Sequence, residues 1–104
     1  MKLWYSNSSP YARKARAVVQ YHKLQDHVEL LLATSGLDKN SPHNLDNPLG
    51  RLPALQRENG EWLYNSSLIA EYLNNIGTQP SLYGNKETRW EILRLHYLAD
   101  GILE

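Results

Sequence analysis

Two neighbouring serines, Ser8 and Ser9, stand directly before Pro10, where a short apolar run gives way to an amphipathic segment. Proline is favoured at the first position of a helix because its missing N–H would be unpaired there, and serine is favoured as the preceding cap. A helix beginning at Pro10 points its free N–H groups at the preceding residues, and this favours a bound anion. A serine hydroxyl there can cap the helix or donate a hydrogen bond outward to an anion such as a thiolate. Both interpretations, cap and turn alone or anion site, stay open on this segment.

A strand and a helix must hold these serines in place. Residues 3–5 are apolar and aromatic, which is typical of a buried strand. After Pro10, the side chains divide on a helical wheel into an apolar stripe of Ala15, Val18 and Val19 and a basic face of Arg13, Lys14 and Arg16. The basic face can attract an anionic ligand, and an ordinary solvated helix face explains it equally well. A second strand follows at residues 28–32, so this segment predicts a right-handed βαβ unit with parallel strands.

A loop and a hairpin are predicted next. Residues 33–47 are polar, and a loop of about fifteen residues indicates a short helical turn within it and a functional reason for its length. Asn59-Gly60 is the favoured pair for a two-residue type I′ turn, and apolar runs lie on both sides of it. We therefore expect residues 55–58 and 61–64 to form two antiparallel strands.

A helix should complete this unit. Ser66 and Ser67 can cap it, its apolar residues recur on one side, and Gly77 ends it. The predicted order is strand, helix, strand, loop with a helical turn, two strands and helix. The fold class is therefore α/β, with a mixed four-stranded sheet.

The last part of the chain predicts a separate helix. Residues 78–85 contain Pro80, Ser81 and Gly84 and are typical of a linker, whereas residues 86–102 are apolar on more than one side of a helix. Such a helix requires packing partners that this chain does not provide. We expect residues 1–77 to form one domain, residues 78–85 a linker, and residues 86–104 the first helix of an all-helical domain whose remainder is absent.

Composition narrows the class of protein. The 104 residues fit one small domain, and 11 basic and 11 acidic residues give no net charge, which argues against nucleic acid as a partner. No apolar run approaches the roughly 18 residues of a membrane span and no secretory signal is evident, so we expect a soluble cytoplasmic protein. Without cysteine, any sulfur nucleophile must come with a ligand. The histidines lack metal-ligand spacing, so we expect no metal site and assign packing or surface roles to His22, His27, His43 and His96.

Four motifs in order resemble one enzyme family. They are Ser9-Pro10-Tyr11-Ala12 with Lys14 and Arg16, the run Asn47-Pro48-Leu49-Gly50-Arg51-Leu52-Pro53-Ala54-Leu55, Asn65-Ser66 with Ile69-Ala70-Glu71-Tyr72-Leu73, and the linker into a further helix. The chain resembles the N-terminal, thioredoxin-like domain of bacterial-type cytosolic glutathione transferases of the serine type, closest to omega, zeta and beta patterns. The resemblance implies an enzyme that binds glutathione as co-substrate, stabilises its thiolate and transfers it to an electrophilic small molecule. It also implies a homodimer when the protein is full length.

The resemblance implies a catalytic residue. Ser9 stands where the omega and beta classes have Cys before the helix proline, so Ser9 is the candidate that activates glutathione. Some serine-dependent classes use the residue one earlier, which keeps Ser8 as the alternative. A free thiol has a pKa of about 8.5, and a charge-assisted hydrogen bond of roughly 1.5 to 3 kcal/mol plus a helix terminus of about 0.3 to 2 kcal/mol would bring it near 7.

The resemblance also implies glutathione-binding residues. Leu52 would pair its backbone with the cysteinyl unit, Pro53 would be cis, and Ser66 would take the γ-glutamyl carboxylate at a helix N-terminus. Arg51 would pair with the glycyl carboxylate. Asn65 departs from the family, which has an acidic residue or Gln there for the γ-glutamyl ammonium, so we expect weaker affinity or another group at the ammonium.

Two functions therefore stay open. The first is a glutathione transferase, of which the 104-residue piece alone should bind glutathione weakly and catalyse little, because the family's second-substrate pocket lies mostly in the helical domain. The second is a non-catalytic thioredoxin-like module that uses the Pro53 edge to bind a peptide or a partner protein.

Overall fold

The sheet is mixed and has four strands. The computed structural model describes residues 1–33 and 52–103. Its strand order is β2-β1-β3-β4, with bounds β1 (Lys2–Tyr5), β2 (Glu29–Leu32), β3 (Ala54–Gln56) and β4 (Trp62–Tyr64). Strand β2 pairs parallel with β1, whereas β3 pairs antiparallel with both β1 and β4. The predicted α/β fold with a thioredoxin-like mixed sheet is confirmed.

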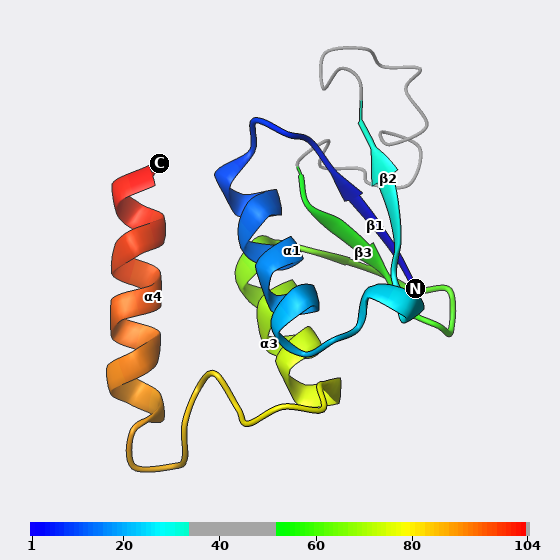
Figure 1. Cartoon of the computed structure of the whole chain (residues 1–104). Coiled ribbons are helices and arrows are strands. Elements are labelled where there is room, and N and C mark those ends of the chain that lie inside the picture. The colour runs from blue at the N-terminus through cyan, green and yellow to red at the C-terminus, as the bar shows by residue number, and fades with distance from the viewer. Residues whose placement is uncertain (34–51, 104) are drawn as a thin grey trace.

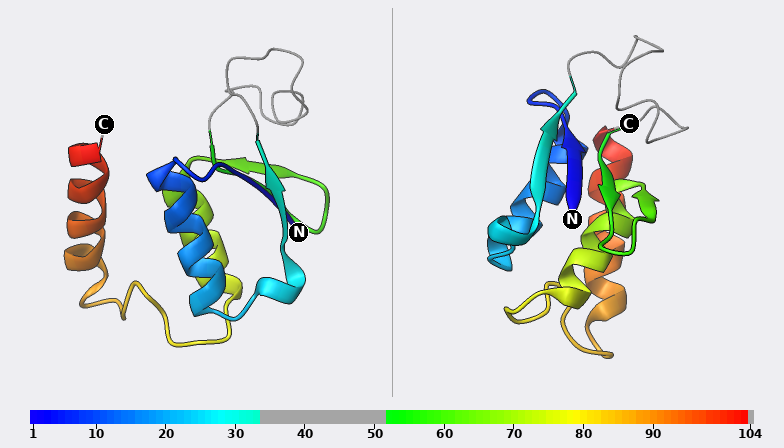
Figure 2. Two further views of the ribbon diagram at one scale, coloured as in Figure 1. Left: turned by 45° about the horizontal axis from the view of Figure 1, so that its top comes forward. Right: turned by 90° about the vertical axis from the view of Figure 1, so that its right-hand side faces the viewer.

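The helices form two further layers (Figures 1 and 2). They are α1 (Pro10–Tyr21), α3 (Ser66–Ile76) and α4 (Arg89–Leu103), with a short 3₁₀ helix at Gln25–His27 between α1 and β2. Helices α1 and α3 lie side by side on the sheet, and α4 lies on their far side. Helix α4 begins at Arg89 and not at residue 86 as predicted. Residues 86–88 form a turn before it, in which Asn85 and Thr88 exchange side-chain-to-backbone hydrogen bonds.

The main core lies between the sheet and the α1–α3 layer. Its largest fully buried apolar side chains are Leu3 and Leu55 from the sheet and Ile69 and Leu73 from α3. Because side chains alternate along a strand, Trp4 and Ala54 point to the opposite face of the sheet, where a second apolar cluster forms. The apolar stripes of both helices therefore face the sheet.

The turn between β3 and β4 differs from the predicted type I′ turn. Gly60 has φ +91°, whereas Asn59 is not among the residues with positive φ, and the Gly60 N–H donates to the Arg57 carbonyl at 2.9 Å. The Arg57 N–H donates to the Glu61 carbonyl at 2.8 Å, which closes a three-residue loop. This is a type I turn with glycine in the left-handed position, because Asn59 keeps negative φ and its side chain accepts from the Glu61 N–H at 2.9 Å.

A buried histidine fixes the end of α1 against the segment after α3. His22 is fully buried, its Nε2 lies 2.9 Å from Asn74 Oδ1, and the Gln79 N–H donates to its Nδ1 at 3.2 Å. The Thr78 hydroxyl donates to the His22 carbonyl at 2.9 Å. Since Nδ1 accepts, Nε2 carries the proton that is donated to Asn74. Of the packing and surface roles predicted for the histidines, His22 therefore has the packing role.

Gly77 leaves the space that this histidine occupies, and its replacement gives a first prediction. A Cβ at Gly77 would lie 2.0 Å from His22 Nδ1, so Gly77→Ala should lower the free energy of unfolding by about 1–3 kcal/mol. In the matched control Gly101→Ala, the new Cβ meets nothing within 4 Å on helix α4, so that change should be neutral or stabilising by up to about 1 kcal/mol. Urea unfolding of both variants checks this. Equal free energies of unfolding in the two variants would show that the His22 ring accommodates a Cβ at residue 77 at no cost.

Candidate functional site

Three strand ends lie at the same edge of the sheet, a few residues away from Ser9, Pro53 and Ser66. Trp4, Ala54 and Tyr64 are neighbours across β1, β3 and β4. The end of β1, the start of β3 and the end of β4 therefore share one edge. Ser9, Pro53 and Ser66 follow or precede these ends by a few residues. Helices α1 and α3 both begin at this edge, so the positive ends of two helix dipoles lie there.

Of the two serines expected before the helix, Ser9 caps α1, and Pro10 is its first residue, as predicted. The Ser9 Oγ accepts a hydrogen bond from the Ala12 N–H at 3.1 Å, and the Ser9 carbonyl accepts from the Arg13 N–H at 3.1 Å. Ser9 is half-buried and Ser8 is exposed. The cap occupies an acceptor position of the Ser9 hydroxyl and not its proton. This geometry leaves Ser9 able to cap the helix and to donate a hydrogen bond outward at the same time.

Asn65 caps helix α3, in place of the predicted Ser66 or Ser67. It has φ +76°, it is exposed, and its Oδ1 accepts from the Ser67 N–H at 2.9 Å. Asparagine tolerates the left-handed region better than serine does, and it is an equally good cap. The carbonyl oxygen expected to meet an ammonium group is therefore already bonded to a backbone N–H, and its second lone pair remains. Ser66 is buried at the first position of α3.

The peptide bond between Leu52 and Pro53 is cis, as the resemblance implied. Pro53 is buried directly before β3, and Leu52 is half-buried against the second apolar cluster. The backbone of Leu52 therefore lies at the edge where α1 and α3 begin. Arg51 lies outside the described residues.

One cavity of the described residues lies away from these side chains. It has a volume of about 470 Å³ and is lined by residues of the β3–β4 hairpin, α3 and the start of α4. None of the predicted site residues lines it. Its arginines are paired, Arg57 with Glu61 at 3.1 Å and Arg89 with Glu71 at 2.9 Å. Because its charges are already paired, the shared strand edge, and not this cavity, is the candidate site.

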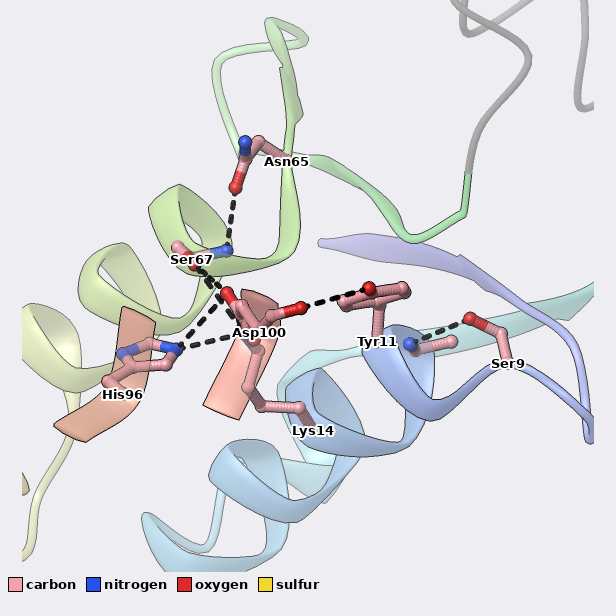
Figure 3. A network of polar contacts seen from close by, with 8 residues as sticks. Ser9, Tyr11, Lys14, Asn65, Ser67, His96 and Asp100 are labelled. Atoms are coloured by element: carbon pink, nitrogen blue, oxygen red, sulfur yellow. Dashed lines mark hydrogen bonds and ion pairs between the residues drawn. The ribbon is translucent and has the colours of Figure 1, made fainter. Parts of the chain in front are cut away.

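A polar network that the sequence did not predict joins α1, α3 and α4 (Figure 3). Lys14 Nζ lies 2.8 Å and 3.0 Å from the two carboxylate oxygens of Asp100 and 2.8 Å from His96 Nε2. The Ser67 hydroxyl donates to Asp100 Oδ2 at 2.7 Å. The side chains of Lys14, His96 and Asp100 are 23%, 15% and 16% exposed. Lys14 is thus neither a solvated helix residue nor a free cation. Only the i, i+4 spacing of His96 and Asp100 signalled the network in the sequence.

Burial and charge set the protonation of this network. Burial, followed by the Lys14 ammonium, lowers the pKa of His96. Burial alone would raise the pKa of Asp100, but the hydrogen bonds from Lys14 and Ser67 outweigh it and lower that pKa. At neutral pH, Asp100 is ionised and His96 is neutral and accepts from Lys14. The 3.9 Å contact between His96 and Asp100 is therefore not an ion pair under these conditions.

Acidification should destabilise the fold through His96. Because the pKa of His96 is lowered, the unfolded chain takes up this proton before the folded chain does. The contribution of neutral His96 is complete above about pH 6.5 and is lost as the pH falls through the lower pKa of the folded state. The pKa of Asp100 is lowered from 3.8, so its carboxylate stays ionised throughout this window.

Urea unfolding of the parent chain and of His96→Gln, at about pH 7.5 and about pH 5.5, measures this effect. Glutamine can still accept from Lys14 but does not titrate. The parent should lose more stability than the variant on acidification. Equal losses would assign the pH dependence to other groups.

The described residues contain neither a membrane-spanning helix nor a cluster of metal-ligating side chains. Over residues 1–33 and 52–103, the helices are too short or too polar to cross a membrane. Within the same ranges, no group of three or more His, Asp or Glu side chains is arranged to hold a metal ion.

Comparison with known proteins identifies the family to which this chain belongs. The model of the glutathione S-transferase N-terminal domain matches residues 8–76. The chain is 30% identical over 115 residues to the Escherichia coli uncharacterized GST-like protein YibF, with 100% of the chain and 50% of that protein covered. It therefore spans about half the length of this relative.

Solved structures agree. A glutathione S-transferase from Methylobacillus flagellatus with GSH bound is 37% identical, with a TM-score of 0.87 over 97% of this chain and 49% of that chain. A glutathione transferase family member from Pseudomonas fluorescens with bound glutathione is 36% identical, with a TM-score of 0.84 over 97% of this chain and 50% of that chain. The matched family model covers both helix starts and the cis proline between them. The chain belongs to the glutathione S-transferase family and carries its N-terminal domain.

Proposed function

We propose that this chain is the glutathione-binding half of a glutathione transferase in which the Ser9 hydroxyl stabilises the thiolate of bound glutathione. The thiolate then attacks an electrophilic small molecule. One observation carries the proposal: Ser9 caps α1 through its oxygen, which would leave its proton for a ligand at the edge where α3 also begins. Two similar structures with glutathione bound support it.

The remaining contacts follow from the geometry of this edge. The thiolate sulfur would accept from the Ser9 hydroxyl, and the hydrogen bond from Ala12 to Ser9 Oγ would polarise that hydroxyl further. Leu52 would pair its backbone with the cysteinyl unit beside cis Pro53. Ser66 and the free N–H groups of α3 would hold the γ-glutamyl carboxylate. Arg51 would pair with the glycyl carboxylate.

The second substrate and the assembly depend on more chain than these 104 residues. Because the chain spans about half of its relatives, we propose that a helical second half packs on α4 and supplies most of the electrophile pocket. The exposed apolar side chains of α4 support this packing and include Trp90, Leu95, Leu98 and Ile102. We further propose that the protein with both halves is a homodimer in the cytoplasm.

The cap made by Asn65 favours one alternative function. If Asn65 Oδ1 stays on the Ser67 N–H, it meets a γ-glutamyl ammonium less well than an acidic residue would. The domain would then be a binding module that recognises a peptide or a partner protein along the Pro53 edge. This module would not bind glutathione measurably.

A titration with glutathione separates the two functions. Amide chemical shifts of the ¹⁵N-labelled chain should move at the starts of α1 and α3 and beside Pro53, and S-methylglutathione should move the same amides. The carboxylates and ammonium are shared by both ligands, whereas only glutathione can form the thiolate. Shifts scattered over the surface, or none at millimolar glutathione, would overturn the transferase proposal in favour of the binding module.

A further inference from the structure

The Asp100 carboxylate touches two helices at once. It accepts from Lys14 Nζ of α1 at 2.8 Å and 3.0 Å and from the Ser67 hydroxyl of α3 at 2.7 Å. The Tyr11 hydroxyl, also from α1, lies 3.4 Å from the backbone carbonyl of Asp100. In Figure 3, Asp100 lies between the first turns of α1 and α3. Helix α4 therefore bridges the other two helices near their N-termini.

These contacts fall on the turns that carry the proposed ligand groups. Tyr11 follows the helix proline, and Lys14 lies within two turns of Ser9. Ser67 is next to Ser66, and its own N–H is the group that Asn65 caps. Ser67 is 4% exposed, so its side chain has little freedom to move. A displacement of Ser67 would move the first N–H groups of α3.

We propose that Asp100 is a positioning residue that sets the separation between the Ser9 turn of α1 and the Ser66 turn of α3. This inference rests on the proposed glutathione site and deepens it. Asp100 acts through Lys14 and Ser67 and does not itself touch the ligand. The direct bond between the two turns, from Lys14 Nζ to Ser67 Oγ, is long at 3.4 Å, so the shared carboxylate is the stronger link.

The proposed role of Asp100 depends on the burial of its ion pair with Lys14. Lys14 and Asp100 are less than one quarter exposed, and a pair with this burial is screened less than a surface ion pair. In Asp100→Asn the Lys14 ammonium keeps its place without a counterion, and Ser67 loses a charged acceptor. The two turns should then sample a wider range of separations, and a ligand that bridges them must select the productive one.

A second ion pair supplies a matched control. Glu71 of α3 and Arg89 of α4 lie 2.9 Å apart and also join these helices, but Glu71 lies more than one turn beyond the start of α3. Glu71→Gln makes the same carboxylate-to-amide change as Asp100→Asn. It loosens α4 without touching the Ser9 or Ser66 turns. Comparing the two variants therefore separates an effect on the positions of the Ser9 and Ser66 turns from an effect on the attachment of α4.

The test is glutathione binding by NMR titration of the 104-residue chain. Asp100→Asn should raise the Kd about fivefold to tenfold, the range of a modest coupling between sites, and Glu71→Gln should change it less than about twofold. Lys14→Met should weaken binding as Asp100→Asn does, and the double variant should add little, since both remove one interaction. Equal effects of Asp100→Asn and Glu71→Gln, or fully additive effects of Lys14→Met and Asp100→Asn, would overturn the proposal.

A measurement on the chain without ligand tests the positioning role of Asp100 independently of the proposed glutathione binding. In the free chain, Asp100→Asn should shift the amide resonances of residues 11–14 and 66–68 and speed their hydrogen exchange, whereas Glu71→Gln should not. If the parent chain does not bind glutathione, the proposed function fails and this readout alone decides the positioning role. If Asp100→Asn does not fold, Ser67→Ala should give the same pattern at smaller size, because it removes the hydrogen bond to Asp100 and the long bond from Lys14 but no charge. Unchanged exchange at both helix starts would refute the role of Asp100.

Discussion

Ser9→Ala should lower the turnover of glutathione conjugation by about 10- to 100-fold, because losing a charge-assisted hydrogen bond of roughly 1.5 to 3 kcal/mol lowers the fraction of bound glutathione that is present as thiolate. The measurement uses a protein that carries this chain and a helical second half. The Kd for glutathione should change less than about threefold, because the groups assigned to its γ-glutamyl and glycyl ends remain. The loss should therefore appear in kcat and not in binding.

The helix cap complicates this variant, and the structure shows how to control for it. Ser9 Oγ bonds to the Ala12 N–H, so Ser9→Ala also costs about 1 kcal/mol of stability. Glycine is nearly as good a cap as serine and has no hydroxyl, so Ser9→Gly should lose the same turnover with a smaller loss of stability. Ser8→Ala should keep both. If Ser8→Ala is inactive while Ser9→Ala and Ser9→Gly turn over normally, the role moves one residue upstream.

The second large effect is a change of chemistry in Ser9→Cys. The parent chain contains no cysteine, so it cannot form a disulfide with glutathione. A cysteine at the start of α1 has its pKa lowered by the helix terminus and is reactive near neutral pH. Its thiolate should attack the sulfur–sulfur bond of glutathione disulfide, form a mixed disulfide with one glutathione and release the other as a thiolate.

Mass spectrometry of the variant after exposure to glutathione disulfide measures this reaction. Ser9→Cys should gain one glutathione per chain at least tenfold faster than Ser8→Cys, because only position 9 lies at the N-cap. Conjugation of electrophiles should fall at the same time. Equal labelling of the two cysteines would argue against the placement of the position 9 side chain in the ligand site.

The start of α1 was predictable because its signals are local. Ser9 and Pro10 specify a cap and a first helical residue within a few positions, and both occur as predicted. The parallel pairing of β1 and β2 followed from a connection of fixed length. The family motifs, as a resemblance, added the cis bond before Pro53, which no local propensity would have indicated.

Errors arose where two local signals compete or where distant segments meet. Asn59-Gly60 suits a type I′ turn, yet Asn59 uses its side chain to hold the Glu61 N–H and the turn becomes type I. Asn65, and not Ser66 or Ser67, caps α3, and its φ of +76° is one that asparagine adopts more readily than serine. In both places the predicted and observed structures differ at only one or two residues of a turn or helix start.

The network around Asp100 has a different cause. Lys14 and Asp100 are separated by 86 residues, and they meet only because α4 lies against α1 and α3. A charged residue on an amphipathic helix gives the same sequence pattern whether it faces water or a partner. Only the tertiary arrangement distinguishes these two states, which is why the sequence left both a solvated face and attraction of an anionic ligand open for Lys14.

The most direct test of the central claim is the pKa of the thiol of bound glutathione, followed by the ultraviolet absorbance of the thiolate as the pH is raised. In the parent protein the bound thiol should titrate near pH 7, about 1.5 to 2 units below a free thiol. In Ser9→Gly it should titrate at least about one unit higher, because a charge-assisted hydrogen bond of roughly 1.5 to 3 kcal/mol is lost. The same pKa in both proteins would contradict the account.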